Sequence, residues 1–224
     1  MLFNSYIFIF AFLPLVLLGY YCLNHSGHLR AGKVWLLAGS WLFYGWWNPI
    51  YLPLLLGSIL INYKLALKIQ SYGRSREIIP PKKRLMLLAV ILNVSLLAYY
   101  KYMDFFIFNA NLLPGVEFEF LRLALPLGIS FFTLQQIAFI VDCYRTGLKE
   151  RNPIDYALFV SFFPQLIAGP IVHHREIMPQ FSATDNAHFS AAKFALGTFV
   201  FTVGLFKKVV IADSFEILVN QGFD

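Results

Sequence analysis

The sequence concentrates side chains capable of acid–base chemistry in a polar HHRE cluster that begins at His173 and His174. A histidine can serve as a general base or carry protons because its pKa lies near neutrality. The cluster directly follows an apolar segment, residues 159–172, whose composition suits a bilayer. We therefore expect His173 and His174 to line a site or a passage inside a membrane protein, and the alternative is that they are interfacial polar residues.

The two histidines do not form a metal-binding pattern. Adjacent residues on a helix point about 100 degrees apart, so they cannot clamp one ion as an i, i+4 pair can. The sequence contains no HExxH and no CxxC, and Cys22 and Cys143 lie far apart in apolar segments. We predict no metal site and no disulfide. GxSxG, Walker and dinucleotide motifs are also missing from the sequence, which argues against a hydrolase or a nucleotide-driven pump.

Proline and glycine interrupt the apolar segment that precedes the histidines. A helix there would lose backbone hydrogen bonds at Pro164 and Pro170, and hydrocarbon offers no water to replace them. Such broken backbone is tolerated where protein shelters it or where it lines a wet cavity. We expect a broken-helix segment over 159–181. The residues expected to wall its passage are Pro164, Gln165, Gly169, Pro170, His173 and His174.

A second set of polar residues recurs every three positions within the predicted span Leu123–Val141. Ser130, Thr133 and Gln136 therefore share one helix face, which should point into a bundle and not toward lipid. These residues are candidates for lining the passage from a neighbouring helix. For the glutamines, including Gln135 and Gln165, hydrogen bonds that lock helices together are the favoured alternative to ligand contact.

The composition predicts an all-α, polytopic transmembrane helix bundle. Of the 224 residues, 58% are hydrophobic and 13% are charged, whereas soluble domains average about 25% charged residues. Five spans are expected before the broken segment, each long enough or apolar enough for a crossing. These spans are Tyr6–Leu23, Val34–Trp47, Tyr51–Leu67, Leu85–Phe108 and Leu123–Val141, with a turn at Asn48-Pro49.

The second half of the chain is harder to assign. Residues 159–172 would extend only roughly 21 Å as a helix, which is typical of a re-entrant or half-helix element. Residues 194–206 are similarly short and end at Lys207-Lys208, and residues 209–219 suit an interfacial amphipathic helix. The sequence leaves open whether this half adds two crossings or none.

Basic residues gather in a stretch over 64–84, which we predict to be a cytoplasmic loop under the positive-inside rule. The same rule places the N-terminus outside an inner (plasma) membrane that the chain crosses several times. Nucleic-acid binding is the rival interpretation, and the apolar segments on both sides of the stretch argue against it. The stretch could also contact anionic lipid or an acidic carrier protein. The N-terminus has no cleavable signal peptide, so we expect it to be retained as a span.

Three separated motifs resemble consecutive signatures of the membrane-bound O-acyltransferase (MBOAT) superfamily. They are LPLGISFFTLQQIAFIVDCYRTG over 125–147, SFFPQLIAGPIVHHREIMPQF over 161–181, and GLFKKVVIAD over 204–213. The amino-terminal segment and SWLFYGWWNP over 40–49 also resemble this superfamily, and the branch they most resemble is the bacterial alginate O-acetyltransferase type. The resemblance extends over the whole chain, with the motifs in the same order.

The resemblance implies a multi-helix enzyme with a tunnel through the bundle. Such an enzyme passes an acyl group from a cytoplasmic thioester, either acetyl-CoA or a carrier protein, to a hydroxyl acceptor. The acceptor is often an exported polysaccharide such as alginate, reached through partner acetylation proteins. A buried histidine in a Trp-His-Gly setting acts as general base, and general-base help is worth roughly 10²- to 10⁴-fold. No bound cofactor is implied.

The chain departs from this pattern in length and in its histidines. Family members are about twice as long, and none of the five histidines here follows a tryptophan. We therefore predict no catalytic residue within this chain, and we interpret residues 1–224 as the N-terminal part of one membrane domain whose C-terminal half carries the base. One alternative is a non-enzymatic partner or scaffold of a polysaccharide modification or export complex. A secondary transporter is a weaker alternative because the sequence has no paired repeats.

Overall fold

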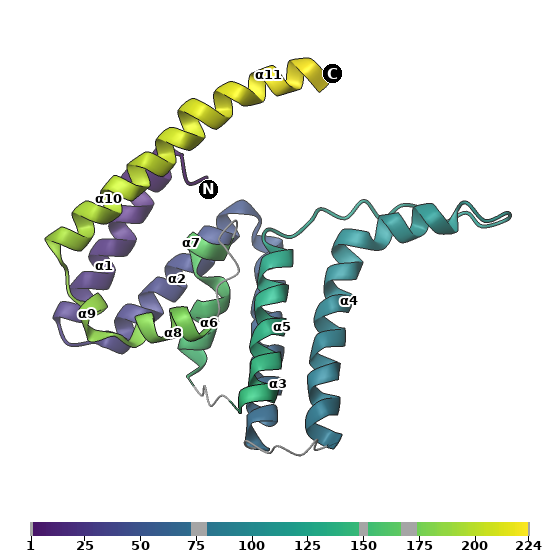
Figure 1. The fold of residues 1–224 in the computed structure, drawn as a ribbon, viewed down its shortest axis with the longest axis horizontal. Coiled ribbons are helices and arrows are strands. Elements are labelled where there is room, and N and C mark those ends of the chain that lie inside the picture. The colour runs from purple at the N-terminus through teal and green to yellow at the C-terminus, as the bar shows by residue number, and fades with distance from the viewer. Residues whose placement is uncertain (1, 73–79, 148–151, 167–173, 224) are drawn as a thin grey trace. The chain divides into compact units, whose positions relative to one another are not determined.

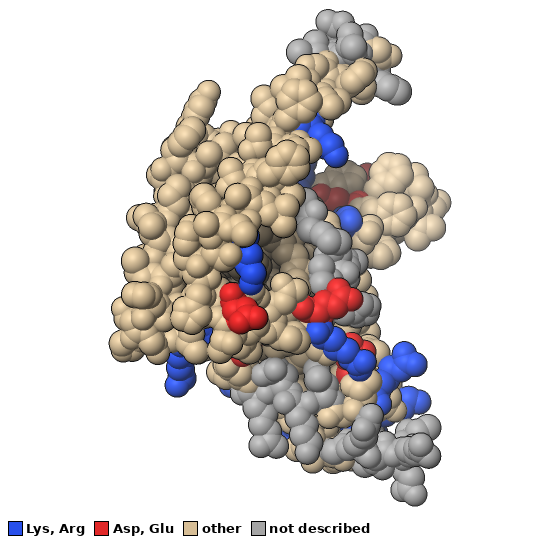
Figure 2. All heavy atoms as spheres, turned by 60° about the vertical axis from the view of Figure 1, so that its left-hand side comes forward, with Lys and Arg blue, Asp and Glu red and all other residues tan. Residues whose placement is uncertain are grey.

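The computed structural model describes residues 2–72, 80–147, 152–166 and 174–223, and these ranges contain helices and loops but no strand. The chain divides into two compact units, each of which is described separately. Unit 1 comprises Met1–Trp35 and Ser182–Asp224, and unit 2 comprises Leu36–Phe181. Figure 1 shows the order of the helices. In the view of Figure 2, most of the visible surface belongs to residues other than Lys, Arg, Asp and Glu. The predicted all-α membrane architecture is confirmed.

Unit 1 begins with a π-helical turn, η1 (Phe8–Phe12), that continues directly into α1 (Leu13–His25). The irregular turn lies just before Pro14, whose missing backbone N–H prevents regular helical hydrogen bonding there. Gly19 lets α1 pack closely against the first turns of α2 (Leu29–Trp47), because a Cβ at this position would lie 2.4 Å from the Trp35 ring. The Trp35 indole N–H donates to the carbonyl oxygen of Val16 at 3.0 Å and holds the two helices together.

The C-terminal part of unit 1 corrects one sequence prediction. After the short helix α9 (Thr184–Ala187), α10 (Ala191–Phe206), the π-helical η3 (Lys207–Ala212) and α11 (Asp213–Phe223) follow one another without a break (Figure 1). We expected a half-helix that ends at Lys207-Lys208 and a separate interfacial helix. The lysines do not end the helix because a long side chain can extend away from the axis, and Lys208 forms an ion pair with Asp213 one turn further on.

In unit 2, three long helices lie side by side: α3 (Leu52–Ser71), α4 (Pro80–Ala110) and α5 (Ile129–Thr146) (Figure 1). The predicted turn after α2 is confirmed, since the Asn48 side chain accepts the Ile50 N–H at 3.0 Å and η2 (Pro49–Tyr51) leads into α3. The described residues of the unit also form the short helices α6 (Pro153–Ser161), α7 (Phe163–Leu166) and α8 (His174–Ser182). Large buried side chains from α2, α5 and α6 form the core, among them Tyr44, Phe132, Phe139 and Tyr156.

Two boundaries differ from the predicted ones. Most of the basic stretch 64–84 is helical, because Lys64 and Lys68 lie in α3 and α4 already begins at Pro80. Prolines are tolerated in the first helical turn, where their missing N–H has no partner to lose. In addition, α5 begins at Ile129 and not at Leu123, because the residues before Gly128 follow an irregular path.

Four helical segments are long and apolar enough to cross a membrane within the described residues: Phe8–His25, Pro49–Ser71, Pro81–Ala110 and Ala191–Glu216. The first three correspond to predicted spans, and the fourth is the helix that the sequence left unassigned. The predicted spans Val34–Trp47 and Leu123–Val141 do form helices, α2 and α5, but neither helix is in this set. For α5 the reason is its polar face, which is buried against protein.

Candidate functional site

The helix break that the prolines predicted lies between α6 and α7. Phe162 leaves the helical conformation, with φ −59° and ψ 114°, and α7 resumes at Phe163 with Pro164 in its first turn. Residues 157–161 of α6, together with Phe163, Gln165 and Leu166, are buried. The prediction that this broken backbone is sheltered by protein is therefore confirmed for the described part of the segment.

Helix α2 supplies the side chains that hold the break. The Ser40 hydroxyl oxygen accepts the backbone N–H of Phe163 at 3.3 Å, and the Trp41 indole N–H donates to the Ser161 hydroxyl at 3.2 Å. Ser161 in turn donates to the carbonyl oxygen of Ala157 at 2.7 Å. An unpaired backbone group is costly in an apolar interior, so the hydrogen bond to Ser40 stabilises the helix break, and the Trp41–Ser161 bond ties α2 to the end of α6.

Removing the Ser40 acceptor should destabilise the break. We expect Ser40→Ala to lower the free energy of unfolding by about 1–2 kcal/mol, because the hydrogen bond from the Phe163 N–H to the Ser40 hydroxyl is lost. Ser71→Ala is the matched control, since this exposed hydroxyl bonds only its own helix and should cost less than about 0.5 kcal/mol. Equilibrium unfolding of the detergent-solubilised chain measures both, and equal losses would contradict the assigned role of Ser40.

Glycine at position 128 allows the start of α5 to approach α7. Gly128 has φ +67°, and a Cβ there would lie 2.5 Å from the backbone oxygen of Leu166. This contact brings the beginning of the polar face of α5 next to the broken helix. The motif over 125–147 therefore has a packing role that sequence reasoning missed, although an isolated glycine before a helix is a recognisable signal.

The polar face of α5 forms a hydrogen-bonded chain across three helices. The Gln136 amide donates to the Ser58 hydroxyl of α3 at 2.9 Å, and its oxygen accepts the Tyr156 hydroxyl of α6 at 3.3 Å. Burial, with Cys143 as a smaller cause, raises the pKa of the Tyr156 phenol well above its usual range, so this group remains a donor. Thr133 is also buried, whereas Ser130 is only half-buried. The inward orientation predicted from the spacing is confirmed for Thr133 and Gln136.

An apolar cleft of about 350 Å³ adjoins this chain. Tyr156 lines the cleft and also belongs to the hydrogen-bonded chain. Trp41, which donates to Ser161 beside the helix break, lines the same cleft. Leu37, Ile59, Tyr63 and Ile154 contribute further apolar walls. An acyl group could lie against these walls, so the cleft, the polar chain and the break together form the candidate site.

His174 is buried at the start of α8, with its Nδ1 atom 3.3 Å from Oδ2 of Asp142 in α5. The rings of Phe139 and Phe159 meet the imidazole edge-on, with centroids 5.4 and 6.4 Å away. A carboxylate beside one ring nitrogen orients the imidazole and favours a proton on that nitrogen. The sequence did not identify Asp142, although an acidic residue near the end of an apolar helix is a usable signal.

The other predicted site residues divide into three groups. Gln165 is buried beside the break, whereas Pro164 is exposed, and their place in the wall of a passage stays a prediction. Gly169, Pro170 and His173 lie outside the described residues. Within the described residues no group of three His, Cys, Asp or Glu side chains could hold a metal ion, and the absence of a metal stays a prediction.

Comparison with known proteins identifies the family. A model of the MBOAT, membrane-bound O-acyltransferase family matches residues 144–224, from the end of α5 through the broken helix to the last residue. The peptidoglycan O-acetyltransferase of Helicobacter pylori is 48% identical over 250 aligned residues, which cover 100% of this chain and 47% of the relative. The chain belongs to the membrane-bound O-acyltransferase family.

Further relatives support the same family. The probable alginate O-acetylase AlgI of Pseudomonas syringae pv. tomato is 38% identical over 100% of this chain and 42% of the relative. The teichoic acid D-alanyltransferase of Lacticaseibacillus rhamnosus is 25% identical over 61% of this chain and 31% of the relative. No solved structure matches the chain. The chain thus spans less than half the length of the curated relatives it matches.

Proposed function

We propose that this chain is the N-terminal part of an O-acetyltransferase that modifies a cell-envelope polysaccharide. The observation that carries the proposal is the 48% identity to a peptidoglycan O-acetyltransferase over the whole of this chain. The alginate O-acetylases, at 36–38% identity, support the same reaction class with another polymer. Peptidoglycan is therefore the acceptor we favour, ahead of an alginate-like polymer.

In this proposal the chain builds the acyl passage and a second segment supplies the chemistry. The passage would use the break at Phe162, the polar chain through Gln136 and the apolar cleft beside Tyr156. An acetyl thioester, either acetyl-CoA or a loaded carrier protein, would be the donor. The general base would come from the C-terminal half that the relatives possess, in keeping with the absence of a Trp-His pair in this sequence. Partner acetylation proteins would deliver the acetyl group to the polymer.

The proposed location is the inner membrane, with the basic ends of α3 and α4 in the cytoplasm and the N-terminus outside. The positive-inside rule supports this orientation because lysines and arginines cluster near these helix ends. A cytoplasmic donor and an exported acceptor would then lie on opposite sides of the passage.

The test is complementation between two halves. We expect co-expression of this chain with the C-terminal half of the Helicobacter pylori relative to restore O-acetylation in a strain lacking the enzyme. Base-released acetate from purified peptidoglycan measures the product, and each half expressed alone is the control. Activity from this chain alone would contradict the assignment of the base to the other half. Co-purification of the halves without any acetate would instead support the non-enzymatic scaffold.

The scaffold remains the second candidate function because this sequence contains no Trp-His pair. It predicts that the chain binds other acetylation or export proteins without any C-terminal half present. Cross-linking of the chain in its own membrane, followed by identification of the partners, separates the two functions.

A further inference from the structure

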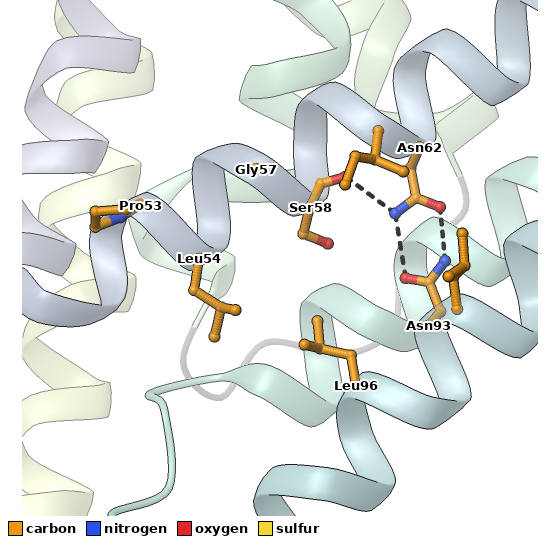
Figure 3. Close-up of a pocket in the computed structure, with 9 residues that line it drawn as sticks. Pro53, Leu54, Gly57, Ser58, Asn62, Asn93 and Leu96 are labelled. Carbon is orange, nitrogen blue, oxygen red and sulfur yellow. Dashed lines mark hydrogen bonds between the residues drawn. The ribbon is translucent and has the colours of Figure 1, made fainter.

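A groove of about 310 Å³ runs between α3 and α4 in unit 2 (Figure 3). Both helices are long and apolar enough to cross a membrane, so the hydrocarbon interior surrounds this groove. Its walls are mainly aliphatic, and Gly57 contributes no side chain. The lining residues are Pro53, Leu54, Gly57, Ser58, Ile61, Asn62, Leu92, Asn93 and Leu96.

The polar residues in the floor of the groove bond to the protein itself. Asn62 and Asn93 exchange amide hydrogen bonds of 3.3 and 2.6 Å across the helix interface, as Figure 3 shows. Each amide also donates to its own helix, to the carbonyl oxygens of Ser58 and Ala89. The floor therefore presents a closed amide pair and not a set of free donors, which suits a hydrocarbon chain better than a polar ligand.

A basic side chain continues the α3 wall of the groove toward one end. Lys68 follows Ile61, which lines the groove, by seven residues on α3, so it lies on the groove face of that helix. Residues 64–72 and 80–84 together contain five basic residues and no acidic residue. Lys68 is exposed, whereas Lys82 is buried with its ammonium 5.4 Å from the Tyr144 ring centre. The end of the groove therefore attracts an anion.

We propose that this groove binds an anionic phospholipid of the surrounding membrane. One acyl chain lies between Gly57, Ile61 and Leu92, and the headgroup phosphate lies near Lys68. Lys68 is six residues beyond Asn62, or about 9 Å along the helix, so a chain anchored at the lysine enters the groove directly. Clustered basic residues at the end of membrane helices attract anionic headgroups at roughly 1 kcal/mol each. The observations that support this binding do not depend on the proposed acetyl transfer.

Photo-crosslinking tests the proposal on the full chain in lipid vesicles. The probes are phosphatidylglycerol and phosphatidylcholine, each with a photoreactive group in the acyl chain, and mass spectrometry maps the labelled peptides. We expect phosphatidylglycerol to label peptides containing 53–62 and 92–96 more strongly than phosphatidylcholine does. Lys68→Gln should reduce this preference about fivefold, and Lys207→Gln in η3 should leave it unchanged.

Gly57→Leu provides a second, independent variant. A Cβ at Gly57 meets no protein atom within 4 Å, so the leucine side chain fills the groove without displacing the protein. Gly197→Leu is the matched control, because Gly197 also lies on a candidate span with no atom near its Cβ. We expect groove labelling to disappear in the first variant and to persist in the second, with both variants retaining the helical circular dichroism spectrum.

Three results would overturn the proposal. Equal groove labelling by the two lipids would show that the charge of the headgroup does not contribute to binding. Undiminished labelling in Gly57→Leu would place the lipid elsewhere. Cross-links between two copies of the chain at Ile61 or Leu92, in place of lipid labelling, would show that a second copy occupies the groove.

Discussion

Substitution of Gly128 by alanine is expected to destabilise the protein by about 3 kcal/mol or more. Two costs combine at this position. A non-glycine residue at φ +67° is strained by roughly 1–3 kcal/mol, and the added Cβ would lie 2.5 Å from the Leu166 backbone oxygen. Because that neighbour is backbone and not a flexible side chain, α7 must move, at a cost of roughly 1–3 kcal/mol. Equilibrium unfolding in detergent measures the loss.

Gly115→Ala separates the two costs. Gly115 also has a positive φ, +80°, but a Cβ there would meet nothing within 4 Å. This variant should therefore show the backbone strain alone, about 1 kcal/mol. Equal losses in the two variants would mean that the close approach of α5 and α7 contributes nothing. In the two-half complementation assay, Gly128→Ala should also reduce O-acetylation, because α7 carries the break that we assign to the acyl passage.

Features that depend on local backbone chemistry were predictable from the sequence. Prolines cannot donate backbone hydrogen bonds, so Pro164 located the break to within two residues of Phe162. The three-residue spacing of Thr133 and Gln136 predicted their burial, because helix geometry alone places such residues on one face. The Asn48-Pro49 turn follows from the same kind of local preference.

Features that depend on a partner from another helix were not predictable. Nothing in the spacing of Ser40 and Trp41 indicates that they satisfy groups more than 100 residues away. Asp142 is likewise identified only by the position of His174. The polar face of α5 acquires its partners, Ser58 and Tyr156, only when α3 and α6 pack against it.

Charged residues near helix ends gave wrong predictions of helix boundaries for a different reason. Lys207 and Lys208 predicted a helix end, and the stretch 64–84 predicted a loop, yet both lie largely in helices. A lysine at the membrane boundary can extend its charge toward water while its backbone stays helical. Charge patterns therefore indicate where a membrane boundary lies better than they indicate where a helix ends.

The second large effect is expected on O-acetylation by the complemented enzyme when His174 is replaced. We expect His174→Ala to lower O-acetylation about tenfold, because the imidazole ties α8 to Asp142 of α5 and packs against Phe139 and Phe159. A displacement of a catalytic site by about 1 Å can cost roughly 100-fold, so tenfold is a moderate positioning effect. Loss of a general base would cost roughly 10²- to 10⁴-fold and would be larger. The rate of acetate transfer, measured at saturating donor, distinguishes the two roles.

The pair Asp142→Asn and His174→Gln tests whether the two residues act together. If the imidazole works through its contact with the carboxylate, each single variant and the double variant should lose similar activity, because the second change removes a contact already broken. Losses that multiply in the double variant would show that the two residues act independently. A loss of 1,000-fold or more in His174→Gln alone, with Asp142→Asn nearly normal, would make His174 the general base and would refute its assignment as a structural residue of the passage.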